Sequence, residues 1–147
     1  MFSNGVRSPK LRELIQPLGP TVCQTRPLET ADRVFSGTDV DFVVVTNLSE
    51  RPIGVLTHRD LEDLKQSHPG KWHAKRCACA VKEQRRLQLD DLVDDVIKLY
   101  NRGLIRPLLV FDGDAVLGVL RPTEVFQWCA ENRPDALERL AFQARHH

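Results

Sequence analysis

The sequence lacks the features that place a protein in a membrane, on nucleic acid or in a secreted disulfide framework. No stretch reaches the roughly 18 consecutive apolar residues of a membrane span, and the N-terminus holds no apolar stretch of signal-peptide length. The 21 Lys and Arg residues against 20 Asp and Glu residues leave a net charge of +1, which gives no general attraction to nucleic acid or anionic lipid. Four unevenly placed cysteines are too few for a disulfide framework, so we expect reduced thiols in a cytoplasmic protein.

Signals of catalysis are also missing. No Ser, Cys or Thr nucleophile comes with an evident base and orienting acid, and no Walker-type phosphate loop is present. We therefore expect a protein that is not an enzyme and needs no catalytic cofactor. With 147 residues, the chain is long enough to bury a sizeable core as one domain or as two small lobes.

What the sequence does contain is an internal repeat. The string G-V-L-T at Gly54–Thr57 returns 64 residues later as G-V-L-R at Gly118–Arg121. Each string follows a strand-like apolar run, Asp41–Val45 in the first copy and Leu108–Phe111 in the second. Turn residues separate each run from its string, so both copies predict a β-hairpin.

Helices are predicted on both sides of each hairpin. Apolar residues at helical spacing begin at Leu28 and again at Leu92, 64 residues later, with Pro27 expected at a first helical position and Asp90 and Asp91 as capping candidates. The remaining predicted elements are helices from His58 to about Gln66, from Pro122 to about Asn132 and over Ala136–Phe142, and short strands over Thr21–Gln24 and Arg86–Leu89.

The order is β-α-β-β-α written twice, which is an α+β fold. A unit of roughly 60 residues is marginal by itself, so we expect the two copies to pack sheet to sheet as a pseudo-twofold pair. The predicted organisation is a first domain with its lead-in helix at 1–67, a linker at 68–74, a second domain at 75–132, and a C-terminal helix and tail at 133–147. The final His146 and His147 are either native or the remnant of a tag.

This order, with L-R-E-L-I at Leu11–Ile15 and G-V-L-T-H-R-D-L at Gly54–Leu61, resembles a tandem pair of CBS domains, named for cystathionine β-synthase and often called a Bateman module. The resemblance covers nearly the whole chain. The family's pattern of Gly, two apolar residues, Ser or Thr, two variable positions and Asp is present at Gly54–Asp60. The resemblance implies a regulatory module that binds AMP, ADP, ATP or S-adenosylmethionine in the cleft between lobes, forms a homodimer and signals to an effector protein.

The residues of the first copy allow such a ligand. Gly54 has no Cβ, so a flat ring can approach the strand there. The Thr57 hydroxyl and the free N–H groups of the first helical turn can hold a phosphate, and His58 and Arg59 can add charge. Asp60 can accept hydrogen bonds from both ribose hydroxyls. With the base-binding positions that the resemblance implies, the first predicted site is Gln24, Thr25, Val40, Asp41, Phe42, Gly54, Thr57, His58, Arg59 and Asp60.

The second copy departs from the pattern. Arg121 stands where the first copy has Thr57, and Glu124 stands where it has Asp60. Glu124 is longer by one methylene, and Arg121 either binds a phosphate or fills the pocket with its bulk. The degenerate second site is predicted at Ile105, Arg106, Pro107, Gly118, Arg121 and Glu124.

Several of these residues have plainer interpretations. Thr57 and Asp60 also fit a helix-capping pair, and the competing hypothesis is a ligand-free structural module for dimerisation or interaction. His73, Cys77 and Cys79 invite a zinc site, but C-x-C without a second pair is unlike structural zinc patterns. A constant offset of 64 instead puts Cys79 in the core and Cys77 on the surface.

Two surface features stay open. The basic run Lys82–Arg86 has no interleaved aromatic residue to stack a base, so a solvated face is the favoured interpretation. Trp128 and Phe126 on the last helix of the second copy serve either an oligomer contact or packing against the C-terminal helix.

Overall fold

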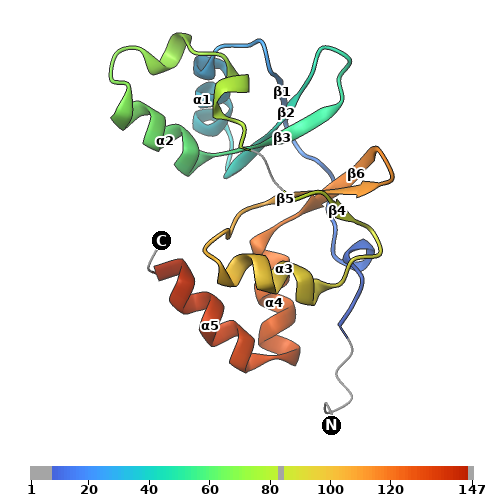
Figure 1. The fold of residues 1–147 in the computed structure, drawn as a ribbon. Coiled ribbons are helices and arrows are strands. Elements are labelled where there is room, and N and C mark those ends of the chain that lie inside the picture. Colours follow the sequence, from blue (N-terminus) through green and yellow to red (C-terminus); the bar gives the residue numbers. More distant parts are fainter. Residues whose placement is uncertain (1–7, 83–84, 146–147) are drawn as a thin grey trace. The chain divides into compact units, whose positions relative to one another are not determined.

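The structure is a computed structural model that describes residues 8–82 and 85–145. The chain divides into two compact units (Figure 1). We call Pro17–Arg85 the first-repeat unit, and the chain up to Gln16 together with Arg86 onward the second-repeat unit. Each unit has its own three-stranded sheet, so the predicted α+β order is confirmed in both. Among the described residues, no helix has the length and apolarity to cross a membrane.

The first-repeat unit follows the predicted β-α-β-β-α order. Its first strand runs parallel to the second, and the second pairs antiparallel with the third. Its elements are β1 (Thr21–Cys23), α1 (Leu28–Gly37), β2 (Phe42–Thr46), β3 (Pro52–Thr57) and α2 (His58–Ser67), followed by the short 3-10 helices η2 (Trp72–Ala74) and η3 (Cys77–Ala80).

The second-repeat unit repeats this plan and adds a helix at the C-terminal end. Its strands pair in the same parallel and antiparallel order. Its elements are η1 (Leu11–Glu13), β4 (Leu87–Gln88), α3 (Val93–Asn101), β5 (Leu108–Asp112), β6 (Ala115–Leu120), α4 (Pro122–Asn132) and α5 (Pro134–Arg145).

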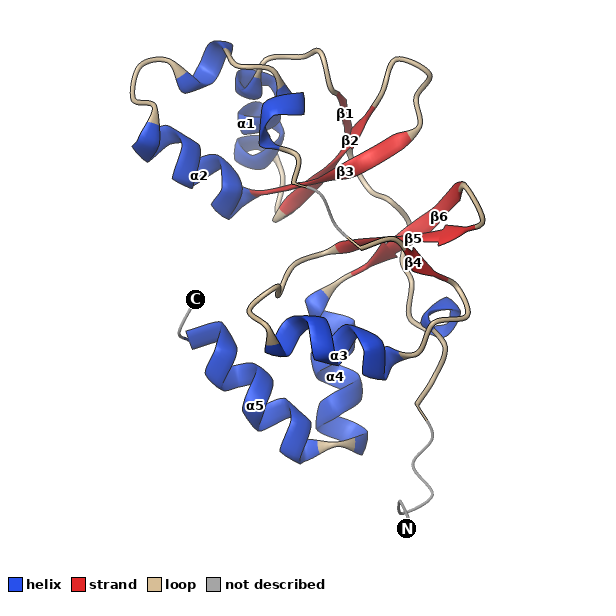
Figure 2. Cartoon of the chain, in the orientation of Figure 1, coloured by secondary structure: helices blue, strands red, loops and turns tan. Residues whose placement is uncertain are grey.

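Apolar residues at helical spacing fill one core in each unit. In α1, Leu28, Ala31 and Phe35 are buried, and they meet Val43, Val45 and Leu56 from the sheet. The helices of each unit lie on one face of its own sheet (Figure 2), as expected for amphipathic helices that bury an apolar stripe. The core of the second-repeat unit also includes Ala136 and Leu140 from α5.

We call residues 10–16 and 76–82 the lead-in segments. Each is exchanged between the repeats: residues 10–16 pack in the second-repeat unit and residues 76–82 in the first-repeat unit. Leu11 is fully buried in the core of the second-repeat unit, and its amide donates to the Asp91 carbonyl at 2.9 Å. Cys77 occupies the matching place in the first-repeat unit, where its amide donates to the Arg26 carbonyl at 2.8 Å. The predicted boundaries at 67 and 75 differ from the compact units in this respect, since each repeat's sheet and helices are completed by a lead-in from outside its own run of sequence.

The repeat spacing is not constant, and this corrects the prediction for two cysteines. The spacing is 66 residues between the residues that precede the lead-in helices, Lys10 and Arg76, and 64 between the N-caps Thr57 and Arg121. The prediction that Cys79 is core and Cys77 surface is therefore wrong, because Cys77 matches the buried Leu11. Cys77 is buried and Cys79 is exposed.

Two predicted helix starts also need correction. Pro27 is the N-cap of α1 and lies one residue before its first helical position. Helix α3 begins at Val93 after the N-cap Leu92, so neither Asp90 nor Asp91 is its N-cap. Asp91 instead accepts a hydrogen bond from the Gln88 amide at 2.8 Å, within the turn that follows β4.

The hairpins carry one matching irregularity. The pairing register shifts after Val45 in the first hairpin and after Val110 in the second. The residue left over on the second strand is Ile53 in one unit and Leu117 in the other, and both side chains are exposed. These bulges lie one residue before Gly54 and Gly118, so they set where the two repeat glycines stand in each sheet.

Candidate functional site

The strand-to-helix junction of the first-repeat unit, where β3 passes into α2, is the candidate site. Thr57 is the N-cap of α2, and its Oγ1 accepts from the Asp60 amide at 3.0 Å. Asp60 Oδ2 accepts from the Thr57 amide at 3.1 Å. This reciprocal pair is a complete capping box, so the capping interpretation of Thr57 and Asp60 is confirmed.

Asp60 is a buried carboxylate at the positive end of a helix. Its side chain is only 8% exposed, and Lys82 Nζ lies 3.4 Å from its Oδ1. The N-terminal end of α2 also favours the negative charge. Both oxygens of Asp60 therefore have partners, one on its own helix and one on the lead-in segment that follows η3.

Gly54 is close-packed against that same lead-in segment. A Cβ built on Gly54 would lie 2.3 Å from Val81 Cγ1, closer than real Cβ atoms approach a neighbour. The close approach predicted for a flat ring is thus made by Val81. Gly54 has a packing reason to be glycine.

The sheet register brings some predicted site residues to this junction. Phe42 pairs with Thr57, and the His58 amide donates to the Asp41 carbonyl at 2.9 Å. His58 and Arg59 are exposed on the first turn of α2, where the His58 ring meets Phe35 edge to face at 5.3 Å between centroids.

Other predicted residues lie elsewhere in the unit. The Gln24 amide donates to the Thr46 carbonyl at 2.7 Å, which places Gln24 and the neighbouring Thr25 at the far end of β2 from Phe42. Four strand steps separate the two ends, about 13 Å at the usual rise. Val40 is partly buried and packs against the core of the unit.

The matching junction of the second-repeat unit is closed by its own side chains. Arg121 is the N-cap of α4 without a side-chain capping bond, and its Nε donates to Glu124 Oε1. Thr123 Oγ1 donates to Glu124 Oε2 at 2.7 Å. Glu124 is thus engaged through both oxygens by the first turn of its own helix.

The remaining residues predicted for the second site have structural partners. A Cβ on Gly118 would lie 2.7 Å from the Gln16 carbonyl oxygen, so here the lead-in backbone covers the glycine. The Arg106 carbonyl accepts from the Tyr100 hydroxyl at 2.9 Å, and burial raises the pKa of that phenol far above its usual range. Ile105 is partly buried against the core, and Pro107 is buried just before β5.

Val81 and Lys82 are the junction residues that sequence reasoning missed. Lys82 stands in the basic run interpreted as a solvated face, of which Glu83 and Gln84 lie outside the described residues, as His146 and His147 do. No local pattern points from Lys82 to Asp60. The pairing follows only from the lead-in exchange, which a constant repeat spacing conceals.

The cysteines and tryptophans take structural positions. Within residues 8–82 and 85–145, no three His, Cys, Asp or Glu side chains are grouped so as to hold a metal ion. Burial raises the pKa of the Cys77 thiol to about 11. Phe126 and Trp128 pack against the core of the second-repeat unit, and Trp72 packs against that of the first.

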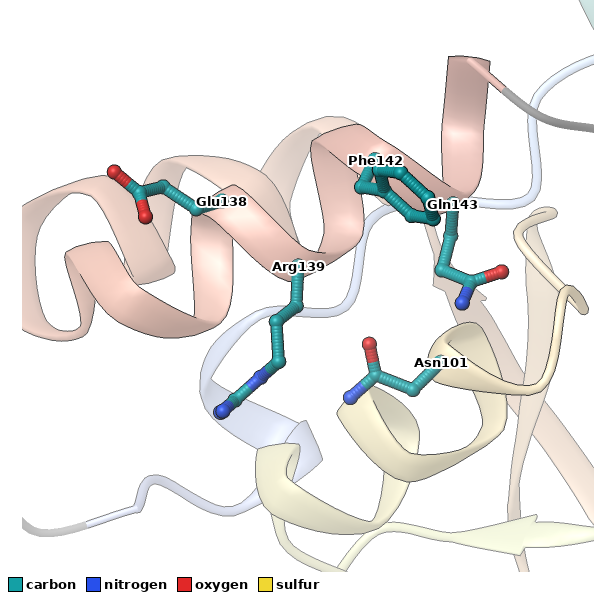
Figure 3. A pocket seen from close by; sticks show the side chains of 5 residues that line it. All are labelled: Asn101, Glu138, Arg139, Phe142 and Gln143. Atoms are coloured by element: carbon teal, nitrogen blue, oxygen red, sulfur yellow. The ribbon is translucent and has the colours of Figure 1, made fainter.

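A pocket of about 430 Å³ lies between α3 and α5 of the second-repeat unit. Figure 3 shows Asn101 of α3 facing Arg139 and Gln143 of α5, with the Phe142 ring nearby. None of the predicted site residues lines this pocket, so it is separate from the strand-to-helix junctions.

Of three comparisons with known proteins, the one with solved structures finds matches. No protein-family model and no curated protein matches the sequence. Solved structures do match. A conserved CBS domain protein of unknown function from Thermoplasma acidophilum is 15% identical with a TM-score of 0.79, over 95% of this chain and 78% of the other. A CBS-domain-containing protein from Agrobacterium tumefaciens is 17% identical with a TM-score of 0.70, over 86% of this chain and 97% of the other.

The CBS domains of a transcriptional regulator from Streptococcus pneumoniae are 15% identical with a TM-score of 0.62, over 81% of this chain and 98% of that one. At these identities the likeness shows the fold. Together with the twice-written β-α-β-β-α order, it identifies the chain as having the fold of a tandem pair of CBS domains.

Proposed function

We propose that the chain is a regulatory module whose first-repeat unit binds an adenosine-containing ligand, AMP, ADP, ATP or S-adenosylmethionine, at the β3–α2 junction. Occupancy of this site is signalled to an effector protein, and the module acts as a homodimer. The observation that carries the proposal is the buried Asp60 carboxylate at the start of α2, next to the exposed His58 and Arg59. No catalytic step is part of the proposal.

The chemistry of the junction suits a nucleotide. An ionised carboxylate has about four acceptor positions, so Asp60 can accept from the two hydroxyls of a ribose while it still caps α2. Charge-assisted bonds of this kind are the stronger class. The exposed side chains of His58 and Arg59 and the N-terminal end of α2 favour a phosphate on the same ribose.

The two junctions are unequal candidates. Glu124 already accepts from Arg121 and Thr123 on its own helical turn. A ligand there must break side-chain bonds on both carboxylate oxygens, whereas the partners of Asp60 include a backbone amide and a lysine that is 65% exposed. We therefore assign the ligand to the first-repeat unit.

A second function is favoured by a specific observation. Gly54, Thr57 and Asp60 each have a structural role, since Val81 covers the glycine and the other two form the capping box. These roles alone explain why the motif has these residue types. The alternative is a ligand-free module for dimerisation or interaction.

A thermal-shift scan separates the two functions. The purified protein is heated with AMP, ADP, ATP, S-adenosylmethionine and, as a control, GMP. A ligand at 100 times its dissociation constant stabilises the folded state by about 2.7 kcal/mol, which is roughly 5–11 °C in melting temperature for a chain of this size. A shift with adenine compounds and none with GMP supports the proposal. No shift with any of them leaves the ligand-free module.

A further inference from the structure

The ion pair between Lys82 and Asp60 carries an inference about which ligand the junction takes. Resting on the adenosine site proposed above, we propose that Lys82 is a specificity-determining residue that selects 5′-phosphorylated adenosine ligands over uncharged adenosine and over S-adenosylmethionine. Lys82 Nζ lies 3.4 Å from Asp60 Oδ1, and Lys82 comes from the lead-in segment, 22 positions along the chain from Asp60.

The backbone of the lead-in segment is held firmly next to the junction. Cys77 and Ala80 are buried in the core of the first-repeat unit, and the Ala78 amide donates to the Gln24 carbonyl at 3.0 Å. Val81 then packs against Gly54. These contacts fix where the Lys82 side chain starts, one residue beyond Val81.

The side chain of Lys82 is much less constrained than its backbone. It is 65% exposed, against 8% for the Asp60 carboxylate. Water competes for the exposed ammonium, which weakens its attraction to Asp60. Lys82 can therefore move from Asp60 Oδ1 to another anion when a ligand takes its place at the carboxylate, whereas Asp60 is fixed by its bond to the Thr57 amide.

A ribose at Asp60 competes with Lys82 for the carboxylate. When the diol takes Oδ1, an uncharged nucleoside gives the displaced ammonium nothing in return. A 5′-nucleotide carries its phosphate on the same ribose, so the ammonium exchanges one anion for another within reach of its flexible stem. Lysine commonly binds phosphate in this way, as a movable point charge.

The same charge argument ranks the ligands. AMP, ADP and ATP bring negative charge to Lys82, His58 and Arg59, whereas S-adenosylmethionine brings a sulfonium and an ammonium with a single carboxylate. Like charges are disfavoured at a site with a nearby ammonium. The arrangement predicts that the junction binds the nucleotides most tightly, adenosine less tightly and S-adenosylmethionine least tightly.

The test is a calorimetric titration of AMP and adenosine into the wild type, Lys82→Met, Lys82→Arg and, as a matched control, Lys71→Met. Lys71 is an exposed lysine of the same unit. Losing the phosphate partner weakens AMP binding in Lys82→Met by about tenfold. Adenosine binding stays the same or tightens a few-fold, because its competitor for Asp60 is gone. Lys82→Arg keeps most of the preference for AMP, and Lys71→Met keeps all of it.

The outcomes are distinguishable. If the wild type binds both ligands and Lys82→Met changes their affinities by equal factors, the role of Lys82 is overturned and the adenosine site stands. If the wild type binds neither AMP nor adenosine but S-adenosylmethionine stabilises it in the thermal-shift scan, this inference fails and the adenosine site stands. If no adenine compound binds, the proposed function fails and this inference fails with it. Melting temperatures close to the wild type for all three variants show that an altered preference is not a folding defect.

Discussion

The two strand-to-helix junctions share a backbone plan and differ in how their acidic residue is held. In the first-repeat unit, Asp60 accepts from the Thr57 amide and meets a lysine from the distant lead-in segment. In the second-repeat unit, Glu124 is held by Arg121 and Thr123 from its own helical turn. The duplicated fold thus keeps its architecture in both copies, while the acidic residue at the junction has a partner from a distant segment in one copy and only partners from its own turn in the bonds described for the other.

Substitutions in the lead-in segments are expected to have the largest effect on stability. Leu11→Ala removes a fully buried side chain from the second-repeat unit and is expected to lower its free energy of unfolding by about 2–5 kcal/mol. Cys77→Ala is the counterpart in the first-repeat unit and costs about 1 kcal/mol, because it removes one sulfur atom. In each variant, the loss of stability is expected in the unit whose core contains the substituted lead-in residue.

The two tryptophans report the units separately. Trp72 lies against the core of the first-repeat unit and Trp128 against that of the second. Chemical denaturation is followed by fluorescence in Trp72→Phe and Trp128→Phe backgrounds. Leu11→Ala should lower the unfolding midpoint that Trp128 reports. A shift in the Trp72 transition alone would contradict the exchange of lead-in segments.

The repeat glycines give the next largest effect. Gly54→Ala and Gly118→Ala should each destabilise by about 1–3 kcal/mol, the usual cost of overpacking. The first clash is with the Val81 side chain, so adding Val81→Ala should recover much of the loss. The second is with the Gln16 carbonyl oxygen, and Ile15→Ala should recover little. Equal rescue in the two units, measured by thermal unfolding, would show that the glycines do not differ in this way.

The helix caps differ by a smaller amount. Thr57→Ala removes a side-chain acceptor from the Asp60 amide and should cost about 1 kcal/mol. Arg121→Ala removes no capping bond and should cost about 0.5 kcal/mol or less. Urea denaturation resolves this difference. A larger loss for Arg121→Ala would mean that its pairing with Glu124 supports the second junction more than the capping box supports the first.

The last prediction concerns the rate at which the cysteine thiols react with a labelling reagent and involves no change in stability. Burial raises the pKa of Cys77 to about 11 and raises that of Cys129, so both stay protonated at pH 8 in the folded protein. Cys79 is exposed, and a hydrogen bond from Thr25 lowers the pKa of Cys23. A disulfide reagent at pH 8 should modify Cys79 and Cys23 quickly and the other two only after denaturation. Fast labelling of Cys77 would contradict its place in the core.

Local patterns predicted most of the fold. The helix at Pro122–Asn132 has the predicted bounds because Pro122 starts it and Pro134 follows its end. The hairpins followed from β-branched runs and turn residues, and the capping box from the spacing of Thr57 and Asp60. Each of these signals lies within a few residues along the chain.

Long-range relations were not predictable in the same way. The assumption of a constant spacing of 64 gave the wrong predicted burial for Cys77 and Cys79. The second repeat is one residue shorter than the first before the hairpin and one residue shorter again within it. The contacts of Val81 with Gly54 and of Lys82 with Asp60 join segments more than 20 residues apart. The sequence identified the junction residues and left open which segment covers them.

The most direct measurement is a calorimetric titration of AMP into the wild type, Asp60→Asn and Glu124→Gln. The amide side chain of the Asp60→Asn variant keeps an oxygen that can accept from the Thr57 amide. It loses the charge that strengthens a bond to the diol, so affinity should fall at least tenfold. Glu124→Gln should leave AMP binding unchanged. No binding by the wild type, or binding that survives Asp60→Asn and is lost in Glu124→Gln, would contradict an adenosine site in the first-repeat unit.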